Sequence, residues 1–127
     1  MISDDVVLSF VPPAKPISMN EGDSWKVRGA SAEWRDAAFW HYVEWCTQHG
    51  HLGPSQRRYV NGARVHVVLP FATERRRDAI NYAKTVKHIV DGIMLAGAWL
   101  DDTAEYVEQN IPTLARQDLC VVRISPA

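Results

Sequence analysis

The most informative stretch of the sequence covers residues 75–107 and reads RRRDAINYAKTVKHIVDGIMLAGAWLDDTAEYV. Apolar residues recur within it at spacings of three and four, which predicts an amphipathic helix over residues 78–96 that ends near Gly97. Three arginines precede this helix, and Asp101 and Asp102 follow it. Basic and acidic groups around one helix are typical of a protein that binds metal and phosphate in one place, although a solvated charged face gives the same pattern.

Two further segments upstream have clear periodicity. Residues 64–70 form a β-branched run after the turn-like Asn61-Gly62, which predicts a central strand leading into the arginine run. Ser31 is a suitable N-cap for a helix over residues 31–49, which Gly50 ends. The aromatic stripe of this helix indicates core packing rather than a ligand site, and it comprises Trp34, Ala38, Tyr42 and Trp45.

The N-terminal part contains one short strand and a long irregular segment. Residues 6–11 form a β-rich run that Pro12 and Pro13 close. Residues 14–29 contain proline, glycine and asparagine without periodicity, which predicts a loop. We consider its basic residues, Lys15, Lys26 and Arg28, to be candidates for DNA contacts.

The C-terminal part predicts two more strands, over residues 105–111 and 119–124, with a turn over residues 112–117. The element order is then β-α-β-α-β-β. This order predicts an α+β domain, in which a mixed β-sheet of about four strands packs against two main helices. A chain of 127 residues fits one domain, so we expect residues 1–127 to form a single unit.

Composition narrows the class of protein. Hydrophobic residues make up 46% and charged residues 23% of the chain, which excludes collagen-like, coiled-coil and wholly disordered classes. Cys46 and Cys120 form no CxxC pair, and we expect both to be reduced and buried. With no run of about 18 apolar residues and acids near the N-terminus, we expect a cytoplasmic protein with no membrane partner. The net charge of −1 is low for a DNA-binding protein, so the clustering of basic residues matters more than their sum.

The acidic residues around the predicted helix suggest a metal site. Asp78 starts the helix and Asp101 and Asp102 follow it, so they converge only if the chain after Gly97 folds back along the helix. Clustered carboxylates are the usual ligands of Mg²⁺, and phosphodiester hydrolysis uses such an ion to activate water. Spacing alone leaves a structural alternative, since Asp78 also suits a helix N-cap and Asp-Asp pairs are common in turns.

The same stretch resembles the signature of the RusA family of Holliday junction resolvases. That signature has basic residues, Asp-x-Asp-Asn, a lysine, a helical aspartate, and a glycine-hydrophobic segment ending in Asp-Asp. The matching positions in this chain are Arg75, Arg76, Arg77, Asp78, Asn81, a lysine, Asp91, Gly97 and the pair Asp101-Asp102. This match covers about a quarter of the chain. Residues 7–13 and 31–36 resemble the family's first strand and the start of its first helix more loosely.

Two departures from the family pattern affect the predicted site. Ile80 stands where the family has its second aspartate, so one expected metal ligand is absent. Three consequences are open. Fewer carboxylates hold the ion, another acid such as Glu74 supplies the missing ligand, or catalysis is reduced or lost. Counting from either end of the motif assigns the family's lysine to Lys84 or to Lys87, and the shorter distance from Asp78 favours Lys84. We interpret Asp91 as a structural partner of Lys87 one turn earlier.

The resemblance implies a Mg²⁺-dependent endodeoxyribonuclease that resolves Holliday junctions by paired nicks, with Mn²⁺ as a candidate substitute. Asp78 and Asp102 would bind the metal, and Asp101 would bind it or orient a water molecule. The arginine run and Asn81 would contact DNA, and Lys84 or Lys87 the scissile phosphate. Two symmetric nicks imply a homodimer. A bacterial or phage-infected cell is the expected setting.

Three alternatives remain open at this stage. The chain is a junction-binding protein that has lost catalysis, a nuclease of flaps or other branched DNA, or an unrelated protein whose Asp-Asp turn is structural. Lone histidines such as His66 and His88 are more often ordinary surface or core residues than metal ligands. Trp99 is better explained by burial than by base stacking.

Overall fold

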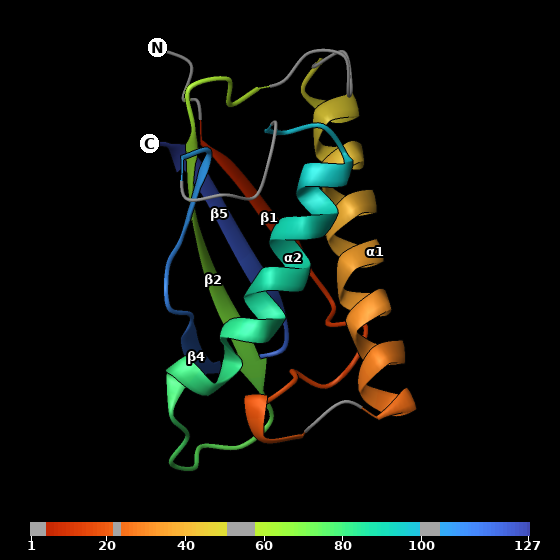
Figure 1. Cartoon of the computed structure of the whole chain (residues 1–127), viewed down its shortest axis with the longest axis vertical. Coiled ribbons are helices and arrows are strands. Elements are labelled where there is room, and N and C mark those ends of the chain that lie inside the picture. The colour runs from red at the N-terminus through yellow and green to blue at the C-terminus, as the bar shows by residue number, and fades with distance from the viewer. Residues whose placement is uncertain (1–4, 22–23, 51–57, 100–104) are drawn as a thin grey trace.

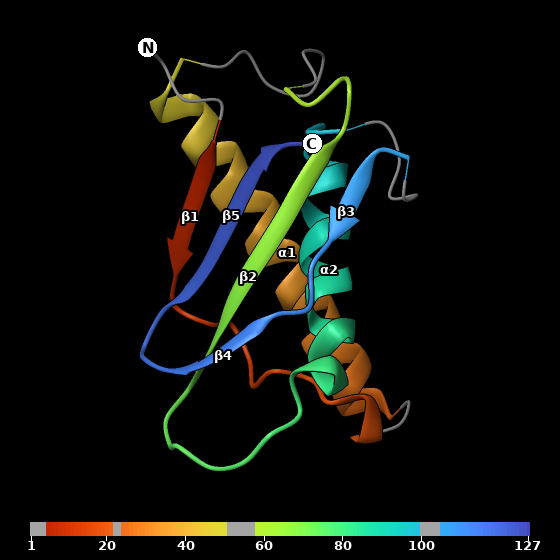
Figure 2. The same cartoon turned by 90° about the vertical axis from the view of Figure 1, so that its left-hand side faces the viewer.

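The protein is a two-layer α+β structure, in which two helices cover one face of a mixed β-sheet (Figures 1 and 2). A computed structural model of the chain describes residues 5–21, 24–50, 58–99 and 105–127. The elements within these ranges are β1 (Val6–Phe10), η1 (Met19–Glu21), α1 (Trp25–Gln48), β2 (Ala63–Phe71), η2 (Ala79–Tyr82), α2 (Ala83–Leu95), β3 (Val107–Gln109), β4 (Thr113–Arg116) and β5 (Cys120–Pro126).

Strand β2 is the centre of the sheet. It pairs antiparallel with β5 along one side, and parallel with β3 and then β4 along the other. β1 completes the sheet by pairing antiparallel with β5. The predicted mixed sheet is therefore confirmed, with β2 leading from its far end into the arginine run.

Helix α1 begins earlier than predicted. Ser24 caps it, because its side-chain oxygen accepts a hydrogen bond from the Val27 amide at 3.3 Å. Ser31 lies inside the helix, where its hydroxyl donates to the Val27 carbonyl at 2.8 Å. The predicted loop over residues 14–29 and the predicted cap at Ser31 are thus wrong at this boundary. Two serines seven residues apart both suit an N-cap, and sequence pattern alone selected the later one.

Strand β4 is the second correction. A turn was predicted over residues 112–117, but Thr113–Arg116 pairs with the end of β2, from Val68 to Phe71. The segment has weak strand propensity and no clear alternation, so its conformation depends on pairing with β2, which a local pattern does not reveal. The described residues accordingly form five strands, where about four were predicted.

Helix α2 matches its predicted apolar stripe but has an irregular start. Residues 79–82 form a 3-10 turn, and the regular helix runs from Ala83 to Leu95. Gly97 follows with a φ of 96°, a conformation that favours glycine and ends the helix where predicted. None of the described helices combines the length and the apolar character needed to cross a membrane.

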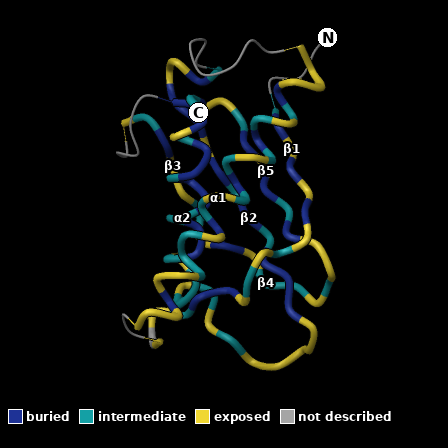
Figure 3. The backbone as a smooth tube through the Cα atoms, turned by 90° about the vertical axis from the view of Figure 1, so that its right-hand side faces the viewer, coloured by how far each residue is buried: buried dark blue, intermediate teal, exposed yellow. Residues whose placement is uncertain are grey.

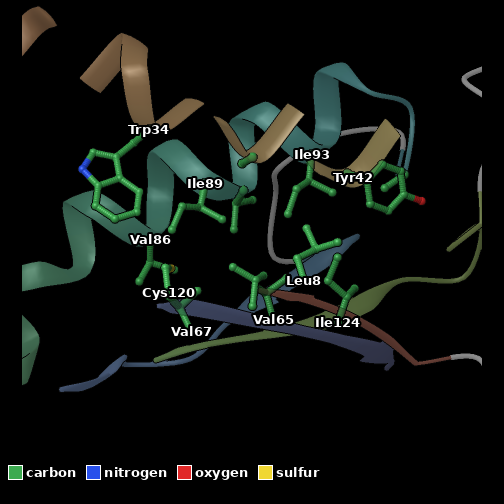
Figure 4. Packing of buried hydrophobic residues seen from close by; sticks show 14 of the residues in the cluster. Leu8, Trp34, Tyr42, Val65, Val67, Val86, Ile89, Ile93, Cys120 and Ile124 are labelled. Carbon is green, nitrogen blue, oxygen red and sulfur yellow. The ribbon is translucent and has the colours of Figure 1, made fainter. Parts of the chain in front are cut away.

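The core lies between the helices and the sheet. Figure 4 shows Val86, Ile89 and Ile93 of α2 directed toward Val65 and Val67 of β2, all of them buried. Burial alternates along β1 and β5 (Figure 3). The buried side chains of the strands face the helices (Figure 4), and the alternate residues of β1 and β5 are partly or fully exposed. The aromatic stripe of α1 belongs to this core, as predicted, with Trp34, Ala38 and Tyr42 buried and Trp45 at its margin.

Gly92 allows the two helices to pack closely. A Cβ atom at this position would lie 2.1 Å from the Arg35 carbonyl oxygen and 3.2 Å from the Ala38 Cβ. The nearest obstacle is backbone, so a larger residue would have to move one helix away from the other. Gly29 of α1 is a useful contrast, since a Cβ atom there would have no neighbour within 4 Å.

We predict opposite effects for alanine at these two glycines. Gly92→Ala should lower the free energy of unfolding by about 3 kcal/mol, the upper part of the range for overpacking a core. Gly29→Ala should raise it by roughly 0.5–1 kcal/mol, because alanine favours an exposed helix over glycine. Urea unfolding followed by circular dichroism measures both. A neutral Gly92→Ala would contradict the close packing, and a destabilising Gly29→Ala would contradict a helix that begins at Trp25.

Candidate functional site

The segment that connects β2 to η2 carries the arginine run. β2 ends at Phe71, and residues 72–78 then cross the end of the sheet beside β4 before η2 begins (Figure 2). Arg75 and Arg76 are exposed in this segment, and Arg77 is half-buried. The parallel pairing of Phe71 with Arg116 fixes the end of β4 next to the start of the segment.

An open groove of about 640 Å³ lies between this segment and β4. Its lining comprises residues 71, 73–77 and 114–116, and includes four arginines and one acidic residue, Glu74. Arg116 is exposed at the end of β4. The groove is therefore a concentrated positive site, the kind of surface that attracts phosphate groups.

Arg77 has a different environment from the other arginines of the groove. Its guanidinium lies over the Phe71 ring, at 4.0 Å from the ring centroid. One terminal nitrogen donates to the Thr73 carbonyl at 3.0 Å, and the other to the Thr73 hydroxyl at 3.4 Å. Its Nε atom is buried, without a hydrogen-bond partner among the described residues. Arg77 thus holds residues 73–77 together as well as contributing charge.

Asp78 lies directly after the arginines, at the N-cap position of η2. Its side chain is exposed and makes no capping hydrogen bond, although its carbonyl accepts from the Asn81 amide at 3.0 Å. The structural explanation of Asp78 as a side-chain cap is therefore not supported, and its carboxylate is accessible. Ile80, at the position of the family's second aspartate, is also exposed, with 53% of its surface accessible.

The two candidate lysines differ in their contacts. Lys87 donates to the Asp91 carboxylate at 2.6 Å, which confirms the predicted pairing of these residues along α2. Lys84 lies one turn nearer to Asp78 and is half-buried. No ion pair of Lys84 is found within the described ranges, so Lys84 remains the better candidate for contact with a phosphate near Asp78.

Asp101 and Asp102 lie outside the described residues. Their nearest described neighbours are Trp99, which follows the C-terminal end of α2, and Glu105, which precedes β3, whereas Asp78 precedes η2 and the N-terminal end of α2. Trp99 is buried, as predicted, with its ring centroid 6.3 Å from that of Tyr59, and Ala98 accepts a hydrogen bond from the Tyr59 amide. The described chain after Gly97 therefore packs at the N-terminal end of β2, and up to Trp99 it does not fold back toward Asp78.

Of the three predicted metal ligands, Asp78 lies in the described part of the chain. No group of three or more histidine, cysteine or acidic side chains is placed there to hold a metal ion, and Asp78 provides one accessible carboxylate. Mg²⁺ sites usually combine one or two carboxylates with water and substrate phosphate. Asp78 meets the lower end of this requirement, and Asp101 and Asp102, the other predicted ligands, lie outside the described residues.

Several residues outside the groove make structural contacts. His66 shares a 2.9 Å hydrogen bond with Thr113, Arg64 pairs with Glu108, and Arg58 lies over the Trp45 ring. Both cysteines are buried and free, and burial raises the pKa of Cys120 to about 12. The three basic residues of the N-terminal segment are exposed, and Lys26 lies over the Trp25 ring.

Arg116 is the member of the groove that sequence reasoning missed. Its charge was visible, but its place beside the arginine run follows from the pairing of β4 with β2. Assigning residues 113–116 to a strand that pairs with β2 would have placed Arg116 beside the arginine run.

No protein-family model matches this chain, and no curated protein matches it in sequence. The resemblance to the RusA family consequently stays a prediction that rests on the residues quoted above.

His88 of α2 interacts electrostatically with Lys84 and Lys87, and its pKa differs from the ordinary value of histidine. Burial lowers its pKa, and Lys84, Lys87 and Arg35 of α1 lower it further, whereas Asp91 opposes the shift. A histidine whose pKa is lower in the folded state than in the unfolded state contributes stability that is fully present above the unfolded pKa. This stability is lost progressively as the pH falls from the unfolded pKa through the folded pKa.

We predict that the free energy of unfolding decreases as pH falls below about 6.5, the ordinary pKa of histidine. His88→Gln should make this decrease smaller, because glutamine does not titrate. Urea unfolding at pH 7.5, 6.5 and 5.5 measures the effect. An equal slope in wild type and His88→Gln would contradict this assignment.

Proposed function

We propose that this chain is a nuclease of branched DNA that resolves four-way junctions, with a Mg²⁺ requirement of the RusA type. One observation carries the proposal. Residues 75–77 and Arg116 form a positively charged groove, and the exposed carboxylate of Asp78 follows the arginines directly. Phosphate contacts and a carboxylate that could bind a metal near the scissile bond are the two requirements of such an enzyme.

The basic groove supports binding of the DNA backbone rather than of a small ligand. It is open to solvent, and its charge comes from four arginines, of which Arg75, Arg76 and Arg116 are exposed. Contacts of this kind neutralise phosphates without reading sequence, so affinity should fall steeply with salt. The nearly neutral net charge of the whole chain would then confine DNA to this end of the molecule.

A homodimer is part of the proposal. Two nicks placed symmetrically across a junction require two sites related by a twofold axis.

A second candidate function is junction binding without catalysis. The exposed Ile80, at the position where the family has an aspartate, favours it. This alternative keeps the basic groove and the dimer, and differs only in the absence of metal-dependent nicking.

A nicking assay on a synthetic four-way junction tests the proposed function. With Mg²⁺, the wild-type protein should make paired symmetric nicks, whereas Asp78→Asn and Asp102→Asn should bind the junction in EDTA but not cut it. Binding in EDTA without any nicking in Mg²⁺ or Mn²⁺ would reject the nuclease and leave the binding protein.

Mixing the two inactive variants separates shared sites from sites within one chain. If each site uses both subunits, an Asp78→Asn and Asp102→Asn heterodimer contains one intact site, and the mixture should nick one strand without resolving the junction. Sites within one chain would leave every site defective, so the mixture would stay inactive.

The exposed position of Ile80 gives a further prediction. Ile80→Asp should leave stability within roughly 0.5 kcal/mol of wild type, because the side chain lies at the surface. It should also increase the rate of nicking if a missing carboxylate limits catalysis. Ile111→Asp is the matched control, since Ile111 is similarly exposed, at 57%, between β3 and β4. Equal rates for wild type and Ile80→Asp would show that the absent aspartate does not limit the reaction.

A further inference from the structure

We propose that Arg116 is a phosphate-binding residue, and that it forms one subsite for the DNA backbone with Arg75 and Arg76. Arg77 is a positioning residue that holds this subsite in shape. The inference rests on the proposed function, because it assigns the residues that would bind the phosphates of the same DNA.

The sheet places Arg116 at the subsite. β4 runs parallel to β2, and Arg116 is the register partner of Phe71, the last residue of β2 before the arginine segment. Neighbouring strands lie about 4.8 Å apart, so the backbone of Arg116 is fixed next to the point where that segment begins. Leu114 and Ala115 complete this side of the groove.

The contacts of Arg77 distinguish it from the other three arginines. Its guanidinium is occupied by the Phe71 ring and by both oxygens of Thr73. These contacts close residues 73–77 into a compact loop. Arg75 and Arg76 then project from a loop whose conformation Arg77 maintains.

The positive charges of the other three arginines of the groove are available to an anionic ligand. Arg75, Arg76 and Arg116 are exposed, and no carboxylate partner for them occurs within the described part of the chain. Glu74 is the one acidic side chain in the described lining. Guanidinium groups bind phosphate oxygens through paired hydrogen bonds, which suits three arginines around one groove. A nucleic-acid backbone presents a series of such phosphate oxygens, so the ligand that we propose is a polymer of phosphodiesters.

The test is the salt dependence of DNA binding in EDTA, measured by fluorescence anisotropy with a four-way junction and with a plain duplex. Arg116→Gln should weaken binding to both by roughly tenfold, the effect of losing hydrogen bonds to a charged group. The slope of log affinity against log salt should become shallower by about 0.9, the value for one phosphate contact. Arg123→Gln is the matched control. His66, its register partner on β2, is five residues or roughly 16 Å from Phe71, so the control should bind like wild type.

Arg77→Lys tests the positioning role. The substitution keeps the positive charge but loses the fork that binds Thr73, so affinity should fall while the salt slope stays near that of wild type. Wild-type affinity for this variant would show that Arg77 acts only as a charge and would overturn its positioning role. Arg77→Lys should also lower the melting temperature, which a simple phosphate contact would not.

The outcomes separate this inference from the proposed function. If Arg116→Gln binds both DNAs like wild type while wild-type protein cuts junctions, the subsite is wrong and the nuclease stands. If Arg116→Gln weakens binding but the wild type neither prefers nor cuts junctions, the subsite stands and the junction nuclease is wrong. If the wild type binds no DNA even at low salt, both fail.

Discussion

The pairing of β2 with three other strands is the constraint on which the rest of the structure depends. β5 fixes one side of β2 over most of its length, and β3 and β4 fix successive parts of the other side. A strand held in this way has a defined end, and residues 72–78 leave the sheet from that end. The position of the arginine groove and of Asp78 is therefore set by backbone hydrogen bonds in the sheet. The helices act at a second level, since the close contact at Gly92 fixes α2 against α1 and hence fixes η2, which follows Asp78.

Much of the fold could be predicted because its periodic segments are strong. The apolar stripe of α2 and the β-branched run of β2 identify their elements without tertiary information, and both are confirmed. Two errors have physical causes. Ser24 and Ser31 are equally good caps by residue type, and the N-cap hydrogen bond to Val27 that distinguishes them is visible only in three dimensions. β4 lacks local strand propensity, and pairing with β2 compensates for this.

The candidate site was predictable to a smaller extent. Sequence pattern identified the arginines and Asp78 as a charged segment, and helical spacing identified the pairing of Lys87 with Asp91. It gave all three arginines the same role, whereas the contacts of Arg77 with Phe71 and Thr73 differ from those of its neighbours. Arg116 was missed because it comes from a distant strand. The convergence of Asp78 with Asp101 and Asp102 stays a prediction, since the latter two lie outside the described residues.

The central claim is that branched DNA binds where residues 72–78 meet β4. Hydrogen–deuterium exchange with and without a four-way junction, in EDTA, tests this claim most directly. The account predicts slower exchange of the backbone amides in residues 72–78 and 113–118 when the junction is bound. It also predicts unchanged exchange along β1, at the other edge of the sheet. Protection confined to β1 and α1, or no protection in residues 72–78, would contradict the account.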